Sequence, residues 1–458
     1  MKGFLSRFDT RAQIVLLALL ALYFLVWPVW RAQFPIEIAE NEGWNAYHAD
    51  AAAGGAALYP PPDTLIVNNY PPLSFYAISW LGRIFGDPLY VGRVLSLVST
   101  IGLGALIARV VLQLGGGGAG AAIGGLWFIA TMARSYNRFV GMDDPQLTGQ
   151  LIMLAALSWL LVRDKAGKSA EPPILLMVAA GFWKHNIIAI PATALAWLWL
   201  RDGWRAWRPT ALGAAAAAIG LAICIALYGD VFMANLLTPR PWRLMRAIGG
   251  IGRAQWIIPA LAIWALWAWS ERNTVAARFT GLYVGVAFAA FVVQWGGEDI
   301  LDNAQFDLVI ATAVGLGIAF DRIGATDFAR RYGVAAARAA VVLILVMRLL
   351  ATLRIEPFLV LFDPAYRAEF YVHALAARQD AARVAAMPGP VACTVKIICR
   401  MAGKPYVWDD FRTDMLIYSG AAKGLDAPGL IRQRGYTYYE NDPRTDVRTL
   451  HRALIGPP

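Results

Sequence analysis

The sequence predicts an α-helical membrane protein that crosses the bilayer about eleven times and ends in a small α/β domain outside it. Apolar residues make up 58% of the 458 positions without counting the 42 glycines, and charged residues only 16%. A soluble domain is about 45–50% apolar with glycine included and about 25% charged. This composition excludes a disordered, collagen-like or disulfide-stapled chain and argues against an ordinary soluble globule.

A membrane span needs ~20 mostly apolar residues to cross ~30 Å of hydrocarbon. Eleven stretches are expected to be spans: 12–30, 88–112, 118–134, 146–163, 173–185, 187–200, 209–228, 256–270, 277–295, 304–320 and 333–353. Only Lys184, His185 and Asn186 separate the fifth and sixth stretches, which are short. They are therefore read either as two half-buried helices or as one long bent helix.

The positions of Lys and Arg predict a cytoplasmic N-terminus, which carries Lys2, Arg7 and Arg11, because short cytoplasmic loops are rich in these residues. The formal net charge of +10 is accordingly interpreted as cytoplasmic loops, with no nucleic-acid partner. With eleven spans the C-terminus lies outside. One outer loop, residues 229–255, carries four arginines against this rule, so another reason for its charge is expected.

Three parts are expected along the chain. Residues 1–353 form the transmembrane domain, with a long first outer loop at 31–87. Residues 354–375 form an amphipathic linker. Residues 376–458 are no longer apolar enough for a span and contain strand-like runs such as 391–395, which predict a small extracytoplasmic α/β domain.

Acidic residues stand at two expected outer boundaries of the membrane. Glu40 and Glu42 lie among apolar and aromatic residues and precede Trp44, and a carboxylate in such a wall can be desolvated and poised as a base. The alternative is plain solvated charge. Asp143 and Asp144 precede a proline in the second outer loop, where they fit either a helix cap or a site for a cation or sugar.

Basic and aromatic residues stand at comparable depths. Lys184 and His185 interrupt an apolar stretch, where ionisable residues are costly and usually functional, although a snorkelling lysine is the alternative. Arg93 can be interpreted in the same two ways, as a functional residue or as a snorkelling cation. Arg240 and Arg243 present forks that suit phosphate oxygens, or else anchor the loop to lipid headgroups.

These features, in this order, resemble the C superfamily of membrane glycosyltransferases (GT-C), and within it the protein O-mannosyltransferase and lipid A aminoarabinose transferase group. The following residues carry the resemblance: Glu40, Glu42, Tyr70, Pro71, Pro72, Leu73, Gly92, Arg93, Asp143, Asp144, Pro145, Lys184, Gly296, Gly297 and Asn303. The runs 389–391, 402–405 and 409–411 look like the small outer domain of bacterial members. One departure is Asn41, which stands where the group commonly has aspartate.

The resemblance implies inverting transfer of a sugar from a polyprenyl-phosphate donor to a glycan, lipid or protein hydroxyl. The reaction would take place at the outer face of a bacterial inner membrane. The implied base is Glu42, with Glu40 as the second choice. The implied phosphate ligands are Lys184, Arg240, Arg243 and, less strongly, Arg93.

For the rest of the site, Asp143 and Asp144 are implied to orient hydroxyls or to bind a divalent metal. No cofactor is required, and metal dependence stays open. Further substrate contacts are expected from Trp44, Tyr70, His185 and Asn303. The sugar and the acceptor are not identified by the sequence.

Two other functions remain open at this point. A transporter or flippase of a lipid-linked saccharide would place Lys184 and His185 on its path, but the chain shows no paired halves. A non-catalytic scaffold with the same fold is kept open by Asn41. In an oxidising periplasm Cys393 and Cys399 can pair only if the chain turns between them, because an extended strand would separate them by ~20 Å.

Overall fold

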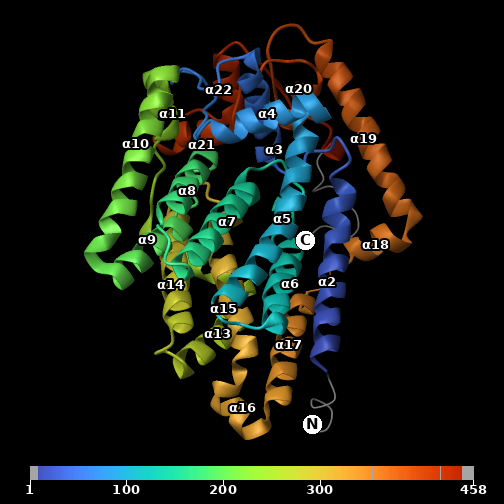
Figure 1. The fold of residues 1–458 in the computed structure, drawn as a ribbon. Helices are drawn as coiled ribbons and strands as arrows, with labels where there is room; N and C mark the ends of the chain where they lie inside the picture. The colour runs from blue at the N-terminus through green and yellow to red at the C-terminus, as the bar shows by residue number, and fades with distance from the viewer. Residues whose placement is uncertain (1–8, 353, 423, 446–458) are drawn as a thin grey trace.

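The computed structural model describes residues 9–352, 354–422 and 424–445. It is an upright bundle of long helices, capped at one end by short helices and loops from the first outer loop and the C-terminal domain (Figure 1). The N-terminal helix begins at the opposite end. Lys2 and Arg7 of the expected cytoplasmic N-terminus, and residues 446–458 of the expected outer domain, lie outside the described residues.

A helix occupies each of the eleven apolar stretches. They are α2 (Thr10–Arg31), α5 (Pro88–Gln113), α6 (Gly118–Ser135), α7 (Gln146–Lys165), α8 (Glu171–Trp183), α9 (Ala189–Asp202), α10 (Trp207–Tyr228), α13 (Ile258–Ser270), α14 (Val275–Trp295), α15 (Phe306–Asp321) and α17 (Val334–Leu350). Because α8 ends at Trp183 and α9 begins at Ala189, the fifth and sixth stretches form two helices.

The expected number of eleven spans is not confirmed. Within the described residues, six helical segments are long and apolar enough to cross a membrane. The number is seven if Leu244–Trp256 and Ile258–Ser270, which meet at 87°, form one broken span. Several of the other apolar helices, such as the 13-residue α8, are too short to cross ~30 Å of hydrocarbon alone.

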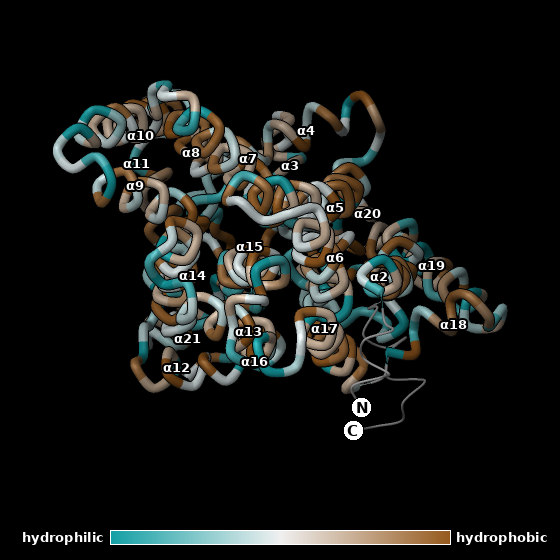
Figure 2. Tube along the Cα trace, turned by 60° about the horizontal axis from the view of Figure 1, so that its bottom comes forward, coloured by the Kyte–Doolittle hydropathy of each residue, from teal (hydrophilic) through white to brown (hydrophobic). Residues whose placement is uncertain are grey.

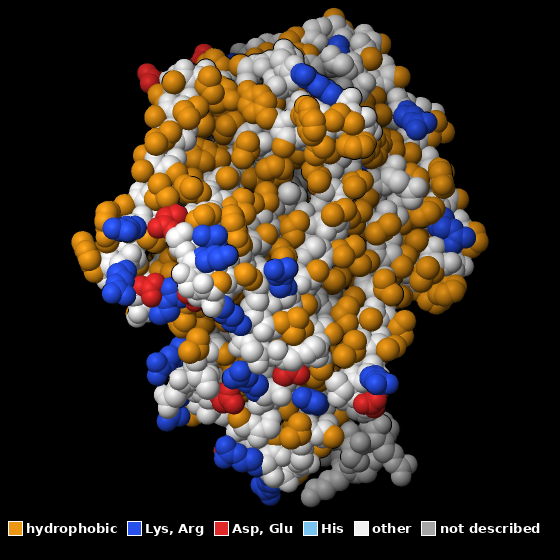
Figure 3. Space-filling model, viewed as in Figure 1, with side chains coloured by type: hydrophobic (Ala, Val, Ile, Leu, Met, Phe, Trp, Pro, Cys, Tyr) orange, Lys and Arg blue, Asp and Glu red, His pale blue; other side chains and the backbone are white. Residues whose placement is uncertain are grey.

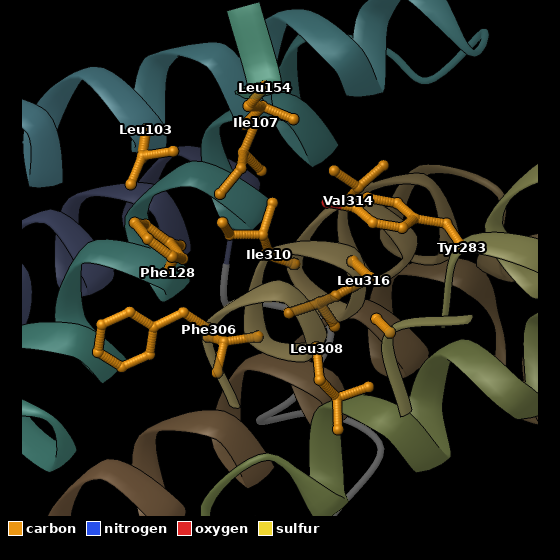
Figure 4. Packing of buried hydrophobic residues seen from close by; sticks show 14 of the residues in the cluster. Leu103, Ile107, Phe128, Leu154, Tyr283, Phe306, Leu308, Ile310, Val314 and Leu316 are labelled. Atoms are coloured by element: carbon orange, nitrogen blue, oxygen red, sulfur yellow. The ribbon is translucent and has the colours of Figure 1, made fainter. Parts of the chain in front are cut away.

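Helix α15 lies at the centre of the bundle, with α6, α13 and α14 around it (Figure 2). Every residue from Phe306 to Phe320 is buried, which fits a helix that is apolar on all sides. Figure 4 shows Ile310 and Val314 of α15 among side chains that include Phe128 of α6 and Tyr283 of α14. This packing fixes the bundle beneath the capped end.

The first outer loop folds into α3 (Glu40–Asp50), the short π-helix η1 (Ala51–Gly55) and α4 (Leu73–Phe85). A helix begins directly after Pro71 and Pro72, whose fixed φ suits a first turn. Helix α4 buries Phe75 and Ile78 and exposes other apolar residues. An amphipathic helix of this kind suits the membrane interface.

The C-terminal domain begins on a long helix. After α18 (Glu356–Phe362), helix α19 runs from Pro364 to Ala385, through the expected boundary at 375/376. Strand β1 (Val391–Cys393) pairs in parallel with β2 (Thr437–Tyr439). Helices α20 (Lys396–Met401), α21 (Asp410–Tyr418) and α22 (Ala427–Gln433) complete this part of the described chain.

Cys393 and Cys399 form a disulfide, with their Cα atoms 5.8 Å apart. The chain turns from β1 into α20 between them, and this turn removes the separation that an extended strand would impose.

Short elements connect the bundle. They are α11 (Asp230–Leu236), α12 (Leu244–Gly250), α16 (Asp327–Tyr332), η2 (Asn137–Phe139), η3 (Gly203–Ala206), η4 (Ile251–Trp256), η5 (Asp302–Gln305), η6 (Ile323–Ala325) and η7 (Pro443–Thr445). On the face shown in Figure 3, hydrophobic side chains cover the upper and middle parts, whereas Lys and Arg gather towards the lower end. This distribution matches a helical bundle in a bilayer with one basic end.

Candidate active site

A cavity of about 350 Å³ lies where five segments meet: the first outer loop, the break between α8 and α9, the loop between α11 and α12, the loop between α14 and α15, and the C-terminal domain. These segments lie at the capped end of the bundle (Figure 1). Its lining is Glu40, Asn41, Trp44, Asn69, Tyr70, His185, Asn186, Leu236, Thr238, Arg240, Gln294, Asp299, Ile300, Leu301, Asn303, Ala304, Lys396, Asp409, Asp410, Phe411 and Asp414. Five of these side chains are carboxylates, so the cavity is a polar chamber built by segments far apart in the sequence.

The first outer loop forms one wall. Glu40 stands at the start of α3 and forms an ion pair with Arg138 of η2. Trp44, one helical turn further on, donates from its indole nitrogen to the Val67 carbonyl at 3.1 Å. Its ring also lies 4.8 Å from that of Tyr70. These contacts fix the aromatic part of the wall.

The break between α8 and α9 brings His185 and Asn186 to the cavity, with Lys184 behind them. The Lys184 ammonium lies 3.4 Å from the centre of the Tyr70 ring and 3.7 Å from an Asp144 oxygen. Only 1% of the lysine is exposed. Tyr70 lines the cavity and Lys184 does not, so the expected phosphate-binding lysine is one layer deeper than the cavity surface.

Arg240 reaches the cavity from the loop that broke the charge rule. This loop is held against the start of the next one, since Trp242 pairs with Gly297 and the Arg243 amide donates to the Gly296 carbonyl at 2.8 Å. The Arg240 guanidinium lies over the ring of Phe411 at 4.2 Å and makes only 3.3 Å contacts to two backbone carbonyls. No carboxylate forms an ion pair with it among the residues that the structure describes.

Burial lowers the pKa of Arg240, and the neighbouring Tyr70 and Asp299 act against this shift. A half-buried guanidinium without an ion pair is a ready partner for an anionic oxygen, because Arg binds phosphate through a rigid fork of donors.

The C-terminal domain forms the opposite wall. Lys396, at the start of α20, donates to an Asp410 oxygen at 2.5 Å and is 3% exposed. Burial alone would lower the pKa of Lys396, but Asp410, Glu37 and Asp409 raise it above its ordinary value. Sequence reasoning quoted residues 409–411 only as a likeness to an outer domain and gave them no role.

Asp409 is the buried carboxylate of this wall, with 3% of its surface exposed. One of its oxygens accepts from the Phe411 amide at 3.1 Å and caps α21. The other, Oδ2, has no hydrogen-bond partner among the described residues. Burial raises the pKa of Asp409 to about 7, with Lys396 opposing the rise and Asp410 adding to it.

Glu42 and Arg93, expected as the base and as a weaker phosphate ligand, do not line the cavity. Glu42 accepts two hydrogen bonds of 2.7 Å from Arg93 and two more from the amides of Ile38 and Asp143. The remaining N–H groups of Arg93 donate to the backbone carbonyls of residues 32, 34 and 36. Both side chains are fully buried and fully engaged, so neither is placed to take a proton or bind a phosphate here.

Three more expected residues lie away from the cavity lining. Asp143 is fully buried and packs so closely on α5 that a Cβ at Gly92 would lie 1.8 Å from one of its oxygens. Asp144 accepts from the Gln146 amide at the start of α7, which is the capping alternative. Arg243 forms an ion pair of 3.3 Å with Glu298, and its side chain is 64% exposed.

Half of the expected site residues therefore line the cavity: Glu40, Trp44, Tyr70, His185, Arg240 and Asn303. Asn303 also contacts the start of α7, since its amide lies 3.4 Å from the Gln146 oxygen. The whole contribution of the C-terminal domain was missed. The one available signal was the Asp409–Asp410 pair, whose place in the cavity depends on contacts far apart in the sequence.

Among the described residues, no group of three or more His, Cys, Asp or Glu side chains is arranged to hold a metal ion.

Comparison with known proteins finds a similar fold. No protein-family model matches the sequence, and no curated protein matches it. The crystal structure of ArnT from Cupriavidus metallidurans bound to undecaprenyl phosphate matches with a TM-score of 0.58 and 14% identity, over 93% of this chain and 89% of that one. The apo state of the same protein matches with a TM-score of 0.57 and 16% identity, over 97% and 91%. The chain therefore has the fold seen in these two ArnT structures.

Proposed function

We propose that this protein is an inverting glycosyltransferase that moves a sugar from a polyprenyl-phosphate donor to an acceptor hydroxyl. The observation that carries the proposal is the cavity itself, where Arg240 without an ion pair faces a set of carboxylates. Transfer of this kind needs positive charge where the phosphate leaves and a base where the acceptor attacks. The similar fold of ArnT, solved with undecaprenyl phosphate, supports a lipid-phosphate donor.

On the donor side, Arg240 stabilises the departing phosphate, and His185 and Asn303 line the same cavity beside it. Lys184 lies behind the Tyr70 ring and adds positive charge to this side of the cavity. A charged donor held here faces fixed cations that need little reorganisation as the phosphate leaves, which is the most effective form of electrostatic catalysis.

On the acceptor side, a cavity carboxylate removes the hydroxyl proton as the oxygen attacks the anomeric carbon. Of the two first-loop acids expected as the base, Glu40 lines the cavity and Glu42 does not. Holding donor and acceptor together in one chamber supplies much of the rate by proximity.

The basic end of the bundle supports the proposed orientation in a bacterial inner membrane. In Figure 3, Lys and Arg gather at the end opposite the cavity. Because basic loops stay in the cytoplasm, the cavity and the C-terminal domain are assigned to the periplasmic side. The disulfide Cys393–Cys399 fits that oxidising compartment.

The test uses the purified full-length protein in lipid nanodiscs. It is incubated with a panel of undecaprenyl-phosphate sugars labelled in the sugar, together with bacterial lipid and envelope-protein fractions as acceptors. We expect at least one donor to lose its sugar, with stoichiometric release of undecaprenyl phosphate. Binding of the donors with no sugar release in any combination would support the scaffold. Passage of an intact donor across a liposome bilayer would support the flippase.

A further inference from the structure

We infer that Asp409, from the C-terminal domain, is the general base of the transfer reaction. This inference rests on the proposed function and goes beyond it, because it assigns the proton transfer to a domain outside the transmembrane bundle. Asp409 takes the place of Glu40, the first-loop candidate for the proton acceptor. Glu40 then holds Arg138 in position through their ion pair.

Asp409 is held in place through both its main chain and its side chain. Its amide donates to the Leu65 carbonyl of the first outer loop at 2.9 Å. Its Oδ1 oxygen accepts from the Phe411 amide, and the Phe411 ring carries the guanidinium of Arg240. The base and the phosphate-binding cation are therefore joined through one short turn of chain.

Asp409 differs from the other four carboxylates of the cavity. Glu40 forms an ion pair with Arg138, and Asp410 forms one with Lys396. The Asp299 side chain is exposed, and burial among its neighbours raises its pKa to about 6, below that of Asp409. Asp414 is partly exposed. An ion pair or access to water stabilises the charged form of a carboxylate and so weakens it as a base. Asn41 lines the same cavity, but an amide cannot accept the proton at all.

The Oδ2 oxygen of Asp409 is buried and has no hydrogen-bond partner among the described residues. A buried acceptor left in this state costs about 1–3 kcal/mol. A small rotation of the carboxylate would bring Oδ2 to the cavity surface, where an entering hydroxyl would remove this cost by donating to it. The same hydrogen bond would place the hydroxyl proton on the base.

The charged surroundings of Asp409 suit proton transfer near neutral pH. The groups whose charges act on it come from α20, α21 and the loops around the cavity: Lys396, Asp410, Arg412, Asp299, Arg240, Tyr70 and Tyr406. Burial is the largest effect and holds the pKa of Asp409 at about 7. A base is most efficient when its pKa lies near the working pH.

The step balances as a single displacement. The acceptor oxygen forms a bond to the anomeric carbon while the bond from that carbon to the phosphate oxygen breaks. The electron pair of the broken bond stays on the phosphate, beside Arg240. The acceptor proton passes to Oδ2 of Asp409 and is later released to water.

The experiment compares two nucleophiles in the same protein. Water must lose a proton as it attacks, whereas the azide ion has none to lose. Asp409→Asn keeps the helix cap, because Asn caps as well as Asp. Asp426→Asn is the matched control, since Asp426 caps α22 by accepting from the Gly429 amide at 2.7 Å and does not line the cavity.

We expect Asp409→Asn to slow donor hydrolysis by about 100-fold or more, while formation of glycosyl azide stays within about threefold of the wild type. The hydrolysis rate of the wild type should rise with pH through about 7, as set by the pKa of Asp409. This rise should persist in Asp409→Glu and vanish in Asp409→Asn. Asp426→Asn should retain both the rate and the rise.

Two results would overturn the inference. One is equal loss of hydrolysis and azide transfer in Asp409→Asn, which would indicate a structural role. The other is unchanged hydrolysis in Asp409→Asn with a loss in Glu40→Gln, which would return the base to the first loop. A wild-type protein that cleaves no donor with either nucleophile would instead reject the proposed function.

Discussion

Glu42 accepts two hydrogen bonds of 2.7 Å from Arg93, and neither side chain has any exposed surface. The pair joins the start of α3 to α5, and Arg93 also holds three carbonyls of the segment between α2 and α3. The acid that the sequence marks as a base thus fixes the first outer loop to the bundle. These contacts hold the wall that carries Glu40 and Trp44.

Glu42→Gln should destabilise the protein strongly. The substitution leaves the buried Arg93 cation without its counter-charge, and breaking a buried pair in this way costs about 3–5 kcal/mol. We expect a clear drop in the apparent melting temperature in detergent. Glu40→Gln is the control, because its ion pair is about one-third exposed and worth little in stability. A Glu42→Gln protein of wild-type stability that has lost all transfer would restore Glu42 to the chemistry.

Arg240→Ala should weaken binding of undecaprenyl phosphate by about tenfold or more, since it removes a charge-assisted, two-pronged contact. The measurement is titration of the lipid phosphate into the protein in nanodiscs. Arg243→Ala is the matched control in the same loop, because that side chain is largely exposed and pairs with Glu298 outside the cavity lining. Equal losses in both variants would mean that the loop attracts the lipid only through its overall charge.

Gly43→Ala should loosen the C-terminal domain from the first outer loop. A Cβ at Gly43 of α3 would lie 2.4 Å from the Cβ of Lys396 and 2.6 Å from a Glu37 oxygen. These distances force the two segments apart. We expect faster protease cleavage of the C-terminal domain and lower transfer activity.

Gly249→Ala in α12 is the control, because its added Cβ would meet no atom within 4 Å. Replacing a helical glycine by alanine at such an open position stabilises the protein. Equal protease sensitivity of Gly43→Ala and the wild type would show that the contact between α3 and α20 can rearrange without loosening the C-terminal domain.

The sequence predicted the positions of the eleven apolar helices, because each coincides with a local apolar stretch, but it did not predict which of them are long enough to cross a membrane. It also singled out Arg240, which lines the cavity, since an arginine on an outer loop that violates the topological bias is visible without a structure. The burial of a side chain and the identity of its ion-pair partner cannot be predicted from the local sequence in this way. That Glu42 is engaged and Glu40 lines the cavity depends on Arg93 and Arg138, which lie 51 and 98 residues further along the chain.

The role of the C-terminal domain was beyond sequence reasoning for the same reason. Asp409 reaches the cavity because its amide bonds to Leu65, and because Arg400 of α20 forms ion pairs with Asp50 and Asp87 of the first outer loop. The sequence around each of these residues contains no local pattern that indicates its distant partner. Nor does the sequence show that Lys184 lies behind the Tyr70 ring, since depth in a bundle is set by packing.

Asp409→Asn should also change how stability depends on pH, whether or not Asp409 is the base. The pKa of this carboxyl is about 7 in the folded protein, against an ordinary value of 3.8 for aspartate. Between these values the folded state binds the proton more tightly than the unfolded state, so wild-type stability falls as pH rises from about 4 to 7 and then levels off.

The neutral asparagine lacks this dependence. We therefore expect Asp409→Asn to gain stability relative to the wild type as pH rises, by about 1 kcal/mol or more at pH 8 relative to pH 4. Melting temperatures of the two proteins across this pH range provide the measurement, with Asp426→Asn as the capping control. Parallel curves for wild type and Asp409→Asn would mean that Asp409 is already ionised at low pH, and would remove the physical basis for its activity near neutrality.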